Sequence, residues 1–279
     1  LARAPGFRLV EGHVDAVEDR QEGGIVHVDG RPVEAAWVFD SVTQDGADGT
    51  AARLTFTGWV VETPADAFDP AVPTLMDFRT PQDGDVRFLY VLPSGPRRAL
   101  VEHTRFGPGT PVGGEAALRD YLTGVLRAGD YRVLRQEGGR LPLRPPPRRP
   151  TTGHVLPIGV AGGMLKASTG YAYGRIQRDS ASVTRSLVRY GHPFALPTGR
   201  RRHAYLDAVL LDVVTAEPDR LQRAFLRLFA RNPGDRVLRF LDEDTSLTQE
   251  ALLVATLPPS PFARAMARRL AAGPAHRRS

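Results

Sequence analysis

The sequence predicts an α+β protein with a β-rich first half, a strand–turn–helix unit and a helical C-terminal region. Residues 53–63 and 86–106 are rich in β-branched and aromatic residues, which predicts strands. Apolar residues at helical spacing recur from residue 203 onward. The 279 residues can bury the core of one large domain or of two smaller ones.

Short strands are expected along the first half of the chain. "GIVHVDG" predicts a strand that ends in a turn, "AAWVFD" a strand that ends at Asp40, and "RLTFTGWVVET" (53–63) a longer strand. "VRFLYVLPSGPRRALVEHTRF" (86–106) predicts a hairpin with Ser-Gly-Pro at its turn. "TLMDFRT" and "YRVLRQEGG" predict two further strands.

The helical segments follow from apolar spacing and from the residues that start and stop helices. Residues 113–129 carry apolar side chains at helical spacing. "HVLPIGVAGG" predicts an apolar strand that runs into glycines, and a helix is expected after it, with Ser168 or Thr169 as a natural N-cap. Five more helices are expected between residues 203 and 273, and the proline-rich "LPLRPPPRRPTTG" predicts a connection.

Composition excludes several classes of site. There is no cysteine, so disulfides, thiolate nucleophiles and cysteine-ligated metals are ruled out. The seven histidines show none of the spacings that hold a metal. The net charge is +6, but 31 acidic residues are interspersed with the basic ones, and no nucleic-acid-binding motif is present. The positive charge instead suits an anionic membrane surface or a phosphate-bearing ligand.

A glycine-rich turn, "GVAGGMLKASTGYAYGRI" (159–176), holds Lys166, the one lysine among the 37 Lys and Arg residues. A helix N-terminus preceded by Gly and Ser/Thr offers free N–H groups and a positive dipole end, which suit a phosphate or another electron-rich ligand. Gly162 and Gly163 would allow close approach of the backbone. The alternative is a plain capped helix after a buried strand, with Lys166 facing solvent.

Two predicted strands carry candidate catalytic carboxylates. In "RALVEHT", Leu100, Glu102 and Thr104 share one face, and a carboxyl group on an apolar face has a raised pKa and can act as a general acid. In "MDFR", Asp77 and Arg79 share one strand face. The alternatives are a glutamate on an edge strand that points to water, and an ion-paired strand face without a catalytic role.

Five blocks of this chain occur in an order that resembles the lycopene cyclases of the flavoprotein β-cyclase type. They extend over most of the sequence, and five blocks in one order are far more specific than any single one. The blocks are "FTGWVVE" (56–62), "FDPAVPTLMDFR" (68–79), "FLYVLPSGPRRALVEHT" (88–104), "EGGRLPL" (137–143) and "GGMLKASTGYAYGRI" (162–176).

The resemblance implies roles at matched positions. Glu102 falls on the acidic residue that the family uses as its catalytic acid, in the E-[DE]-T block, and Asp77 and Arg79 fall in its M-D-[FYW]-R block. The turn that closes on the flavin implies these cofactor contacts: Gly162, Gly163, Lys166, Ser168, Thr169, Gly170 and Tyr171. The sequence departs from the pattern at the second acidic position, which is His103, and at the proline position, which is Ala167.

The implied activity is cyclisation of the ψ-ends of lycopene to β-ionone rings by acid-initiated carbocation chemistry. It requires reduced FAD, with NAD(P)H as the reductant, and gives no net redox change. The implied partners are lycopene or a related carotene and a membrane surface, without nucleic acid, for an enzyme peripherally associated with the membrane from the cytoplasm. The alternatives are a related flavoprotein oxidoreductase acting on an apolar isoprenoid or aromatic substrate, and an inactive remnant or basic binding protein.

The implied fold is the C-terminal part of an FAD-dependent flavoprotein of the hydroxylase and reductase type. The family's N-terminal strand–GxGxxG–helix does not occur in these 279 residues, so we expect the chain to lack the segment that holds the FAD pyrophosphate. The expected parts are a remnant of the FAD-binding domain (1–52), a β-rich substrate domain (53–145), an FAD-binding strand–turn–helix (146–190) and a helical C-terminal region (191–279).

Overall fold

The computed structural model describes residues 6–42, 53–107, 113–143, 149–166, 169–197 and 201–271. The chain divides into two compact units. The first unit consists of residues 1–47, 145–166 and 171–199, and the second of residues 48–144, 167–170 and 200–279. Sheets and helices are both abundant, which confirms the predicted α+β class.

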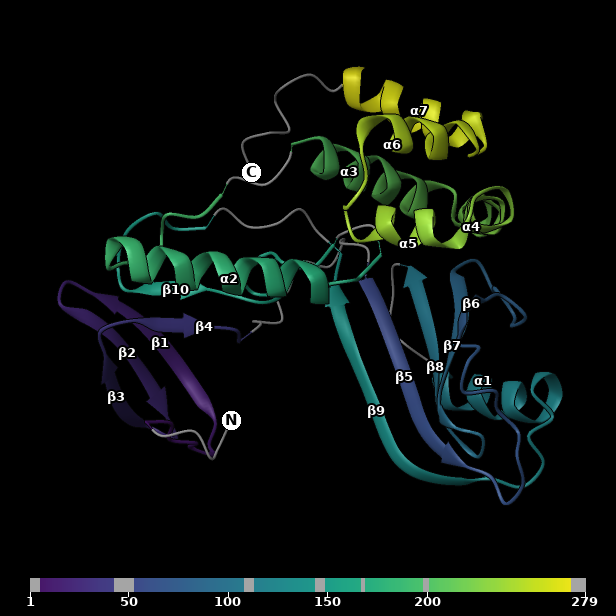
Figure 1. Ribbon diagram of the computed structural model, residues 1–279, viewed down its shortest axis with the longest axis horizontal. Helices are drawn as coiled ribbons and strands as arrows, with labels where there is room; N and C mark the ends of the chain where they lie inside the picture. Colours follow the sequence, from purple (N-terminus) through teal and green to yellow (C-terminus); the bar gives the residue numbers. More distant parts are fainter. Residues whose placement is uncertain are drawn as a thin grey trace. The chain divides into compact units, whose positions relative to one another are not determined.

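The first unit begins with an antiparallel meander of β1 (Val14–Arg20), β2 (Gly23–Val28) and β3 (Arg31–Ala35) (Figure 1). The turn between β2 and β3 consists of Asp29 and Gly30, with φ angles of 49° and 73°. Positive φ at both central residues is the geometry of the tight hairpin turns for which Asp-Gly is favoured. This dipeptide therefore fixes the register of the second hairpin.

The rest of the first unit is a short parallel sheet and a long helix. β4 (Val38–Asp40) pairs in parallel with β10 (Val155–Pro157), and α2 (Tyr173–Tyr190) follows in the chain. The rings of Trp37 and His154 stack at 5.1 Å next to these strands. The imidazole of His154 is also within hydrogen-bond distance of two backbone carbonyls, 2.9 Å from that of Ala36 and 3.1 Å from that of Gln21.

The second unit is built on a five-stranded antiparallel sheet in the order β6–β7–β8–β5–β9 (Figure 1). The predicted hairpin over 86–106 is confirmed, with its turn at Pro96 and Arg97. β5 lies between β8 and β9, which are distant in sequence from one another and are not neighbours in the sheet. The strands are β5 (Arg53–Glu62), β6 (Thr74–Asp77), β7 (Val86–Gly95), β8 (Arg98–Gly107) and β9 (Arg132–Pro142).

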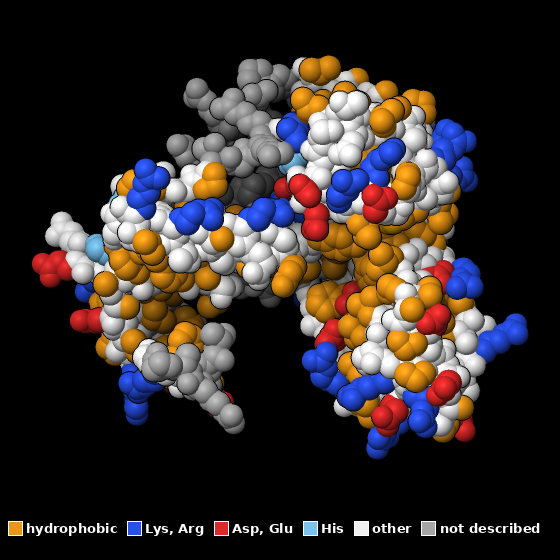
Figure 2. Space-filling view, viewed as in Figure 1, with side chains coloured by type: hydrophobic (Ala, Val, Ile, Leu, Met, Phe, Trp, Pro, Cys, Tyr) orange, Lys and Arg blue, Asp and Glu red, His pale blue; other side chains and the backbone are white. Residues whose placement is uncertain are grey.

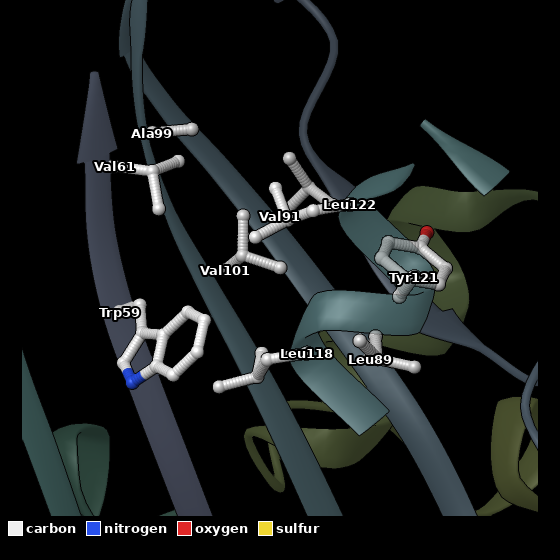
Figure 3. Close-up of a cluster of buried hydrophobic side chains, with 9 residues drawn as sticks. All are labelled: Trp59, Val61, Leu89, Val91, Ala99, Val101, Leu118, Tyr121 and Leu122. Carbon is white, nitrogen blue, oxygen red and sulfur yellow. The ribbon is translucent and has the colours of Figure 1, made fainter. Parts of the chain in front are cut away.

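One face of this sheet, here named the helix face, is covered by α1 (Gly114–Asp120) and the π-helical turn η1 (Tyr121–Val125). Nine buried side chains form the core between them (Figure 3). They are Trp59, Val61, Leu89, Val91, Ala99, Val101, Leu118, Tyr121 and Leu122. The other face carries the alternate residues of the same strands, among them Leu100, Glu102 and Thr104, and is here named the glutamate face.

The helical C-terminal region predicted from residue 203 is confirmed. It consists of α3 (Arg201–Ala216), α4 (Pro218–Arg231), α5 (Gly234–Leu241), α6 (Leu247–Ala255) and α7 (Pro259–Ala271). Ser246 and Gln249 form a capping box at the start of α6, in which each side chain bonds the other's backbone N–H. α3 contacts β8 and α4 contacts β7. Over the described residues, every helix is too short or too polar to cross a bilayer.

We expect Leu118→Ala to lower the free energy of unfolding by about 3 kcal/mol, because the change leaves a cavity under α1 where Leu118 is fully buried. Denaturant unfolding followed by circular dichroism measures the loss. The matched control is Leu270→Ala in α7, whose side chain is 77% exposed, and there the change should stay within about 0.5 kcal/mol. Equal losses in the two variants would contradict the assigned core.

Candidate active site

Glu102 lies in the middle of β8 and its side chain is partly buried on the glutamate face. The hydroxyl of Thr104, two residues along the same face, donates a hydrogen bond of 2.7 Å to Oε1 of Glu102. Thr104 is 1% exposed, so this hydrogen bond is protected from water and fixes the carboxyl group. The predicted sharing of one face by Leu100, Glu102 and Thr104 is therefore confirmed.

The neighbouring strands determine what faces Glu102. On β7 the residue directly opposite is Tyr90, and on β5 it is Gly58. Gly58 is in turn directly opposite Glu137 of β9. Because opposite residues of antiparallel strands share a face, two carboxyl groups flank one glycine across three strands.

The environment of Glu102 favours the protonated acid. Burial, with its loss of hydration, raises the pKa of the Glu102 carboxyl, and the negative charge of Glu137 raises it further. The hydrogen bond from Thr104 acts in the opposite direction and is smaller than the effect of burial. Since Thr104 donates to Oε1, the proton of the neutral acid is left to Oε2.

Aromatic side chains surround the approach to this acid on the glutamate face. Phe88 and Phe56 are the residues opposite Thr104 on the two flanking strands. The ring of Phe88 makes edge contacts with Tyr90 at 5.3 Å and with Phe78 at 5.6 Å, and Phe78 stacks on Phe225 of α4 at 6.5 Å. This face is therefore aromatic on the β7 side of Glu102 and charged on the β9 side, where Glu137 and Arg135 lie.

Asp77 and Arg79 form an ion pair and lie away from Glu102. They do not share a strand face as predicted, because β6 ends at Asp77 and Arg79 lies beyond it. The guanidinium of Arg79 donates to the Asp77 carboxylate, with Nη2 2.6 Å from Oδ2, and Tyr121 OH donates to the same oxygen at 2.6 Å. Tyr121 belongs to the core on the helix face, and the strand partner of Asp77 is Leu89 on that face. The structure therefore places the Asp77 carboxylate on the sheet face opposite Glu102.

His103 follows Glu102 in the sequence and points to the helix face. It is 6% exposed, and its Nε2 has no hydrogen-bond partner among the described residues. Burial, together with the positive charges of Arg87 and Arg105, lowers the pKa of His103 to about 4. A neutral histidine on the opposite face does not act on the Glu102 carboxyl, whose pKa responds to burial, Thr104 and Glu137.

The glycine turn of the first unit follows β10, at the carboxyl ends of the parallel pair β4–β10. Gly163 has φ +79°, and a Cβ on Gly162 would lie 2.5 Å from the carbonyl oxygen of Pro157. The N–H groups of Gly162 and Gly163 donate to the carbonyls of Ile158 and Val160. Both glycines are thus required by the turn itself, and their N–H groups are used within it.

The predicted helix start at Ser168 or Thr169 is wrong. α2 begins at Tyr173 with Ala172 in the N-cap position and without a side-chain cap. Gly170 has φ +75°, which a right-handed helix does not accommodate, so the helix forms only beyond it. The backbone N–H of Lys166 donates to the carbonyl of Tyr171 at 2.7 Å and closes this loop. Ser168 lies outside the described residues.

Gly170 brings the end of this turn to the glutamate face. A Cβ at Gly170 would lie 2.6 Å from Cδ1 of Leu54 and 3.9 Å from Cδ1 of Leu141, which are opposite one another on β5 and β9. Leu54 is four residues from Gly58, which is roughly 13 Å along the strand. Of the predicted cofactor contacts, Gly170 therefore shares a sheet face with Glu102, whereas Gly162, Gly163, Lys166 and Tyr171 belong to the first unit.

Two residues at this site were not assigned from the sequence. Glu137 stands in a block that resembles the family, and Gly58 stands in another, but neither block indicates that the two residues are strand neighbours. The partner strands are far apart in sequence, and only the pairing of β5 with both β8 and β9 brings Gly58, Glu102 and Glu137 into one row.

Comparison of the sequence with known proteins identifies its family. The model of the family described as "Lycopene cyclase protein" matches residues 2–267. The chain belongs to the lycopene cyclase family. It is also 27% identical over 261 residues to a lycopene beta-cyclase of Paracoccus sp., an alignment that covers 85% of this chain and 65% of that protein. The chain thus spans just under two thirds of the length of this curated relative.

Solved structures similar to this lycopene cyclase family member come from other flavoprotein-related groups. One is a geranylgeranyl bacteriochlorophyll reductase-like protein of Thermoplasma acidophilum, with 13% identity and a TM-score of 0.48 over 90% of this chain and 68% of that one. Another is the HpxO protein of Klebsiella pneumoniae, solved with FAD and uric acid, with 15% identity and a TM-score of 0.49 over 84% of this chain and 66% of that one.

We expect the protein to lose stability as the pH falls from 7 to about 4.5, in part because of His103. Its pKa is about 4 when folded and about 6.5 when unfolded, so the unfolded chain binds more protons over this range. The loss attributable to this histidine is on the order of 2–3 kcal/mol. His103→Gln should remove that part of the slope of unfolding free energy against pH, whereas exposed His13→Gln should not. An unchanged slope in His103→Gln would contradict the buried neutral histidine.

We expect Tyr121→Phe to lower the free energy of unfolding by about 2 kcal/mol, because it removes a hydrogen bond to the buried Asp77 carboxylate. Tyr190→Phe, at a 53% exposed position, is the matched control and should be nearly neutral. Asp77→Asn should also destabilise the protein. If Asp77→Asn abolished turnover at full stability, Asp77 would act in catalysis rather than in holding β6 to η1.

Proposed function

We propose that this protein cyclises the ψ-ends of lycopene or of a related carotene to β-ionone rings, with Glu102 as the acid that starts the reaction. The proposal rests on one observation above all. In a chain of the lycopene cyclase family, a carboxyl group with a raised pKa lies at the matched position, on a sheet face that is aromatic on the β7 side. Alkene protonation needs a neutral carboxylic acid in dry surroundings.

The proposed reaction is an isomerisation. The proton of Glu102 Oε2 is transferred to a carbon of the terminal double bond, so a C–H bond forms and a tertiary carbocation results. A neighbouring double bond attacks this cation and closes the six-membered ring. Loss of one ring proton then forms the β-ring double bond, so that atoms and electrons balance and the product has the mass of the substrate.

Residues near Glu102 support the cationic steps. The rings of Phe56, Phe88 and Tyr90 flank the strand position of Glu102 and Thr104, and the π-face of an aromatic ring attracts a cation. Thr104 holds the carboxyl in one orientation during proton transfer. The apolar strand neighbours Leu100 and Val60 exclude water, which would otherwise trap the cation as an alcohol.

A flavin is the proposed cofactor, with NAD(P)H as its reductant. When bound, reduced FAD supplies negative charge that stabilises a cationic transition state without net electron transfer. The turn over residues 159–171 is the proposed contact region. Since the N–H groups of Gly162 and Gly163 serve the turn, we assign the contact to the buried Lys166 of the first unit, whose cationic side chain suits an anionic flavin.

Lycopene dissolves in membranes, so the proposed substrate implies docking at a bilayer surface from the cytoplasm. Hydrophobic, basic and acidic side chains are interspersed over the helical region on the side seen in Figure 2. Exposed apolar residues of these helices include Leu226, Leu238 and Leu270, which alternate with arginines along the chain. Such an interface suits adsorption to anionic lipid rather than insertion.

We expect Glu102→Gln to reduce the conversion of lycopene by roughly 10²–10⁴-fold, because glutamine cannot donate the initiating proton. The measurement is chromatography and mass spectrometry of the products after incubation with lycopene vesicles and reduced FAD. Glu115→Gln, a surface change on α1, is the control and should retain full turnover.

A product of unchanged mass with a cyclic end group supports the cyclase. Addition of oxygen or of two hydrogens would identify a flavoprotein oxidoreductase instead. A wild-type chain that leaves lycopene unchanged in this assay, or a Glu102→Gln variant with full turnover, would overturn the proposed function.

A further inference from the structure

We infer that Glu137 is a positioning residue for Glu102, because its negative charge favours the protonated form of the Glu102 carboxyl. Gly58 lies between the two glutamates in the sheet, and its lack of a side chain allows the Glu137 carboxyl to approach Glu102. The role of this pair in catalysis rests on the proposed function. The electrostatic interaction between the two carboxyl groups depends only on the sheet, so it can be measured without substrate.

The geometry of the row supports this inference. Gly58 is directly opposite Glu102 on one side and Glu137 on the other. A Cβ at Gly58 would lie 3.0 Å from Cγ and 3.4 Å from Oε1 of Glu137, and 3.2 Å from Cδ1 of Leu100 of β8, so the Glu137 side chain lies over the glycine next to Leu100. A larger residue at this position would push Glu137 away. The glycine therefore permits a glutamate two strands away to approach the acid.

Several charged groups lie on the elements around Glu102, and Glu137 is the one whose charge acts on it. On the glutamate face, β9 contributes Glu137 and Arg135. The helices α3 and α4 also contact the sheet. α3 carries the buried Asp207 and Arg202, which is paired with Glu250 of α6, and α4 carries Arg220, which is paired with Glu217.

Glu137 is partly exposed and ion-paired with an arginine of its own strand. Its side chain is 29% exposed, and Nη2 of Arg135 lies 2.8 Å from its Oε2. Arg135 is itself 65% exposed. The Glu137 carboxylate therefore has an ion-pair partner on its own strand, and it contributes a negative charge to the row that contains Glu102.

The alternation of side chains along β8 explains why an acidic residue at position 103 is not needed to act on the Glu102 carboxyl. Adjacent residues of a strand point to opposite faces, so the residue after Glu102 cannot face its carboxyl. His103 is on the helix face among arginines. A carboxylate that acts on Glu102 must come from a neighbouring strand, and Glu137 supplies it.

The test is titration of Glu102 by ¹³C NMR in protein labelled at the glutamate carboxyl carbons, with the Glu102 signal assigned from its absence in Glu102→Gln. We expect Glu137→Gln to move the titration midpoint of Glu102 to lower pH. Arg135→Gln should move it to higher pH, because the neutralising partner of Glu137 is gone. Glu115→Gln, on the other face, should leave the midpoint unchanged.

An unchanged midpoint in Glu137→Gln, or shifts of the same sign in Glu137→Gln and Arg135→Gln, would overturn the inference. A general loss of structure would shift the titration midpoint of Glu102 in the same direction in both variants. Shifts of opposite sign therefore indicate an electrostatic effect and not a change in packing. In the lycopene assay, the high-pH limit of turnover should follow the NMR midpoint in each variant. If the midpoints shift as expected while the wild type forms no cyclic product, the pair stands and the proposed function fails.

Discussion

The placement of β5 between β8 and β9 is the constraint on which the second unit depends. β5 hydrogen-bonds along its whole length to both neighbours, from Arg53 to Glu62. Its alternate residues contribute Trp59 and Val61 to the core under α1, and Gly58 and Val60 to the opposite face. A slip of one residue in either pairing would exchange the two faces, so the buried core fixes the register of the site as well.

Many of the helices and strands could be predicted from the sequence because they depend on residues that are close together in the chain. Two β-rich arms around a turn predicted the β7–β8 hairpin, and apolar spacing predicted all five C-terminal helices. The turn itself was predicted at Ser-Gly-Pro, but it lies at Pro96 and Arg97, because Ser94 and Gly95 belong to β7. The start of α2 was misplaced, because capping preference favours Ser or Thr while the backbone at Gly170 has a positive φ that excludes a helix. Backbone conformation at a glycine is not encoded in its neighbours' capping propensities.

The candidate site was only partly predictable for a related reason. The face occupied by Glu102 follows from alternation within one strand. Its relation to Glu137, and the separation of Asp77 onto the other face through Tyr121, depend on pairings between segments 30 or more residues apart. Residue patterns within a strand cannot specify which strand lies next to it.

The alternation along β8 divides its residues into two sets that respond differently to substitution. Ala99, Val101 and His103 face the helix side, so sequence drift there is limited by folding. Leu100, Glu102 and Thr104 face the other side. Substitutions at the partly exposed Leu100 therefore alter the surroundings of Glu102 without entering the core, whereas Thr104 and Phe106 on the same side are fully buried and restrict change as strongly as the odd-numbered residues.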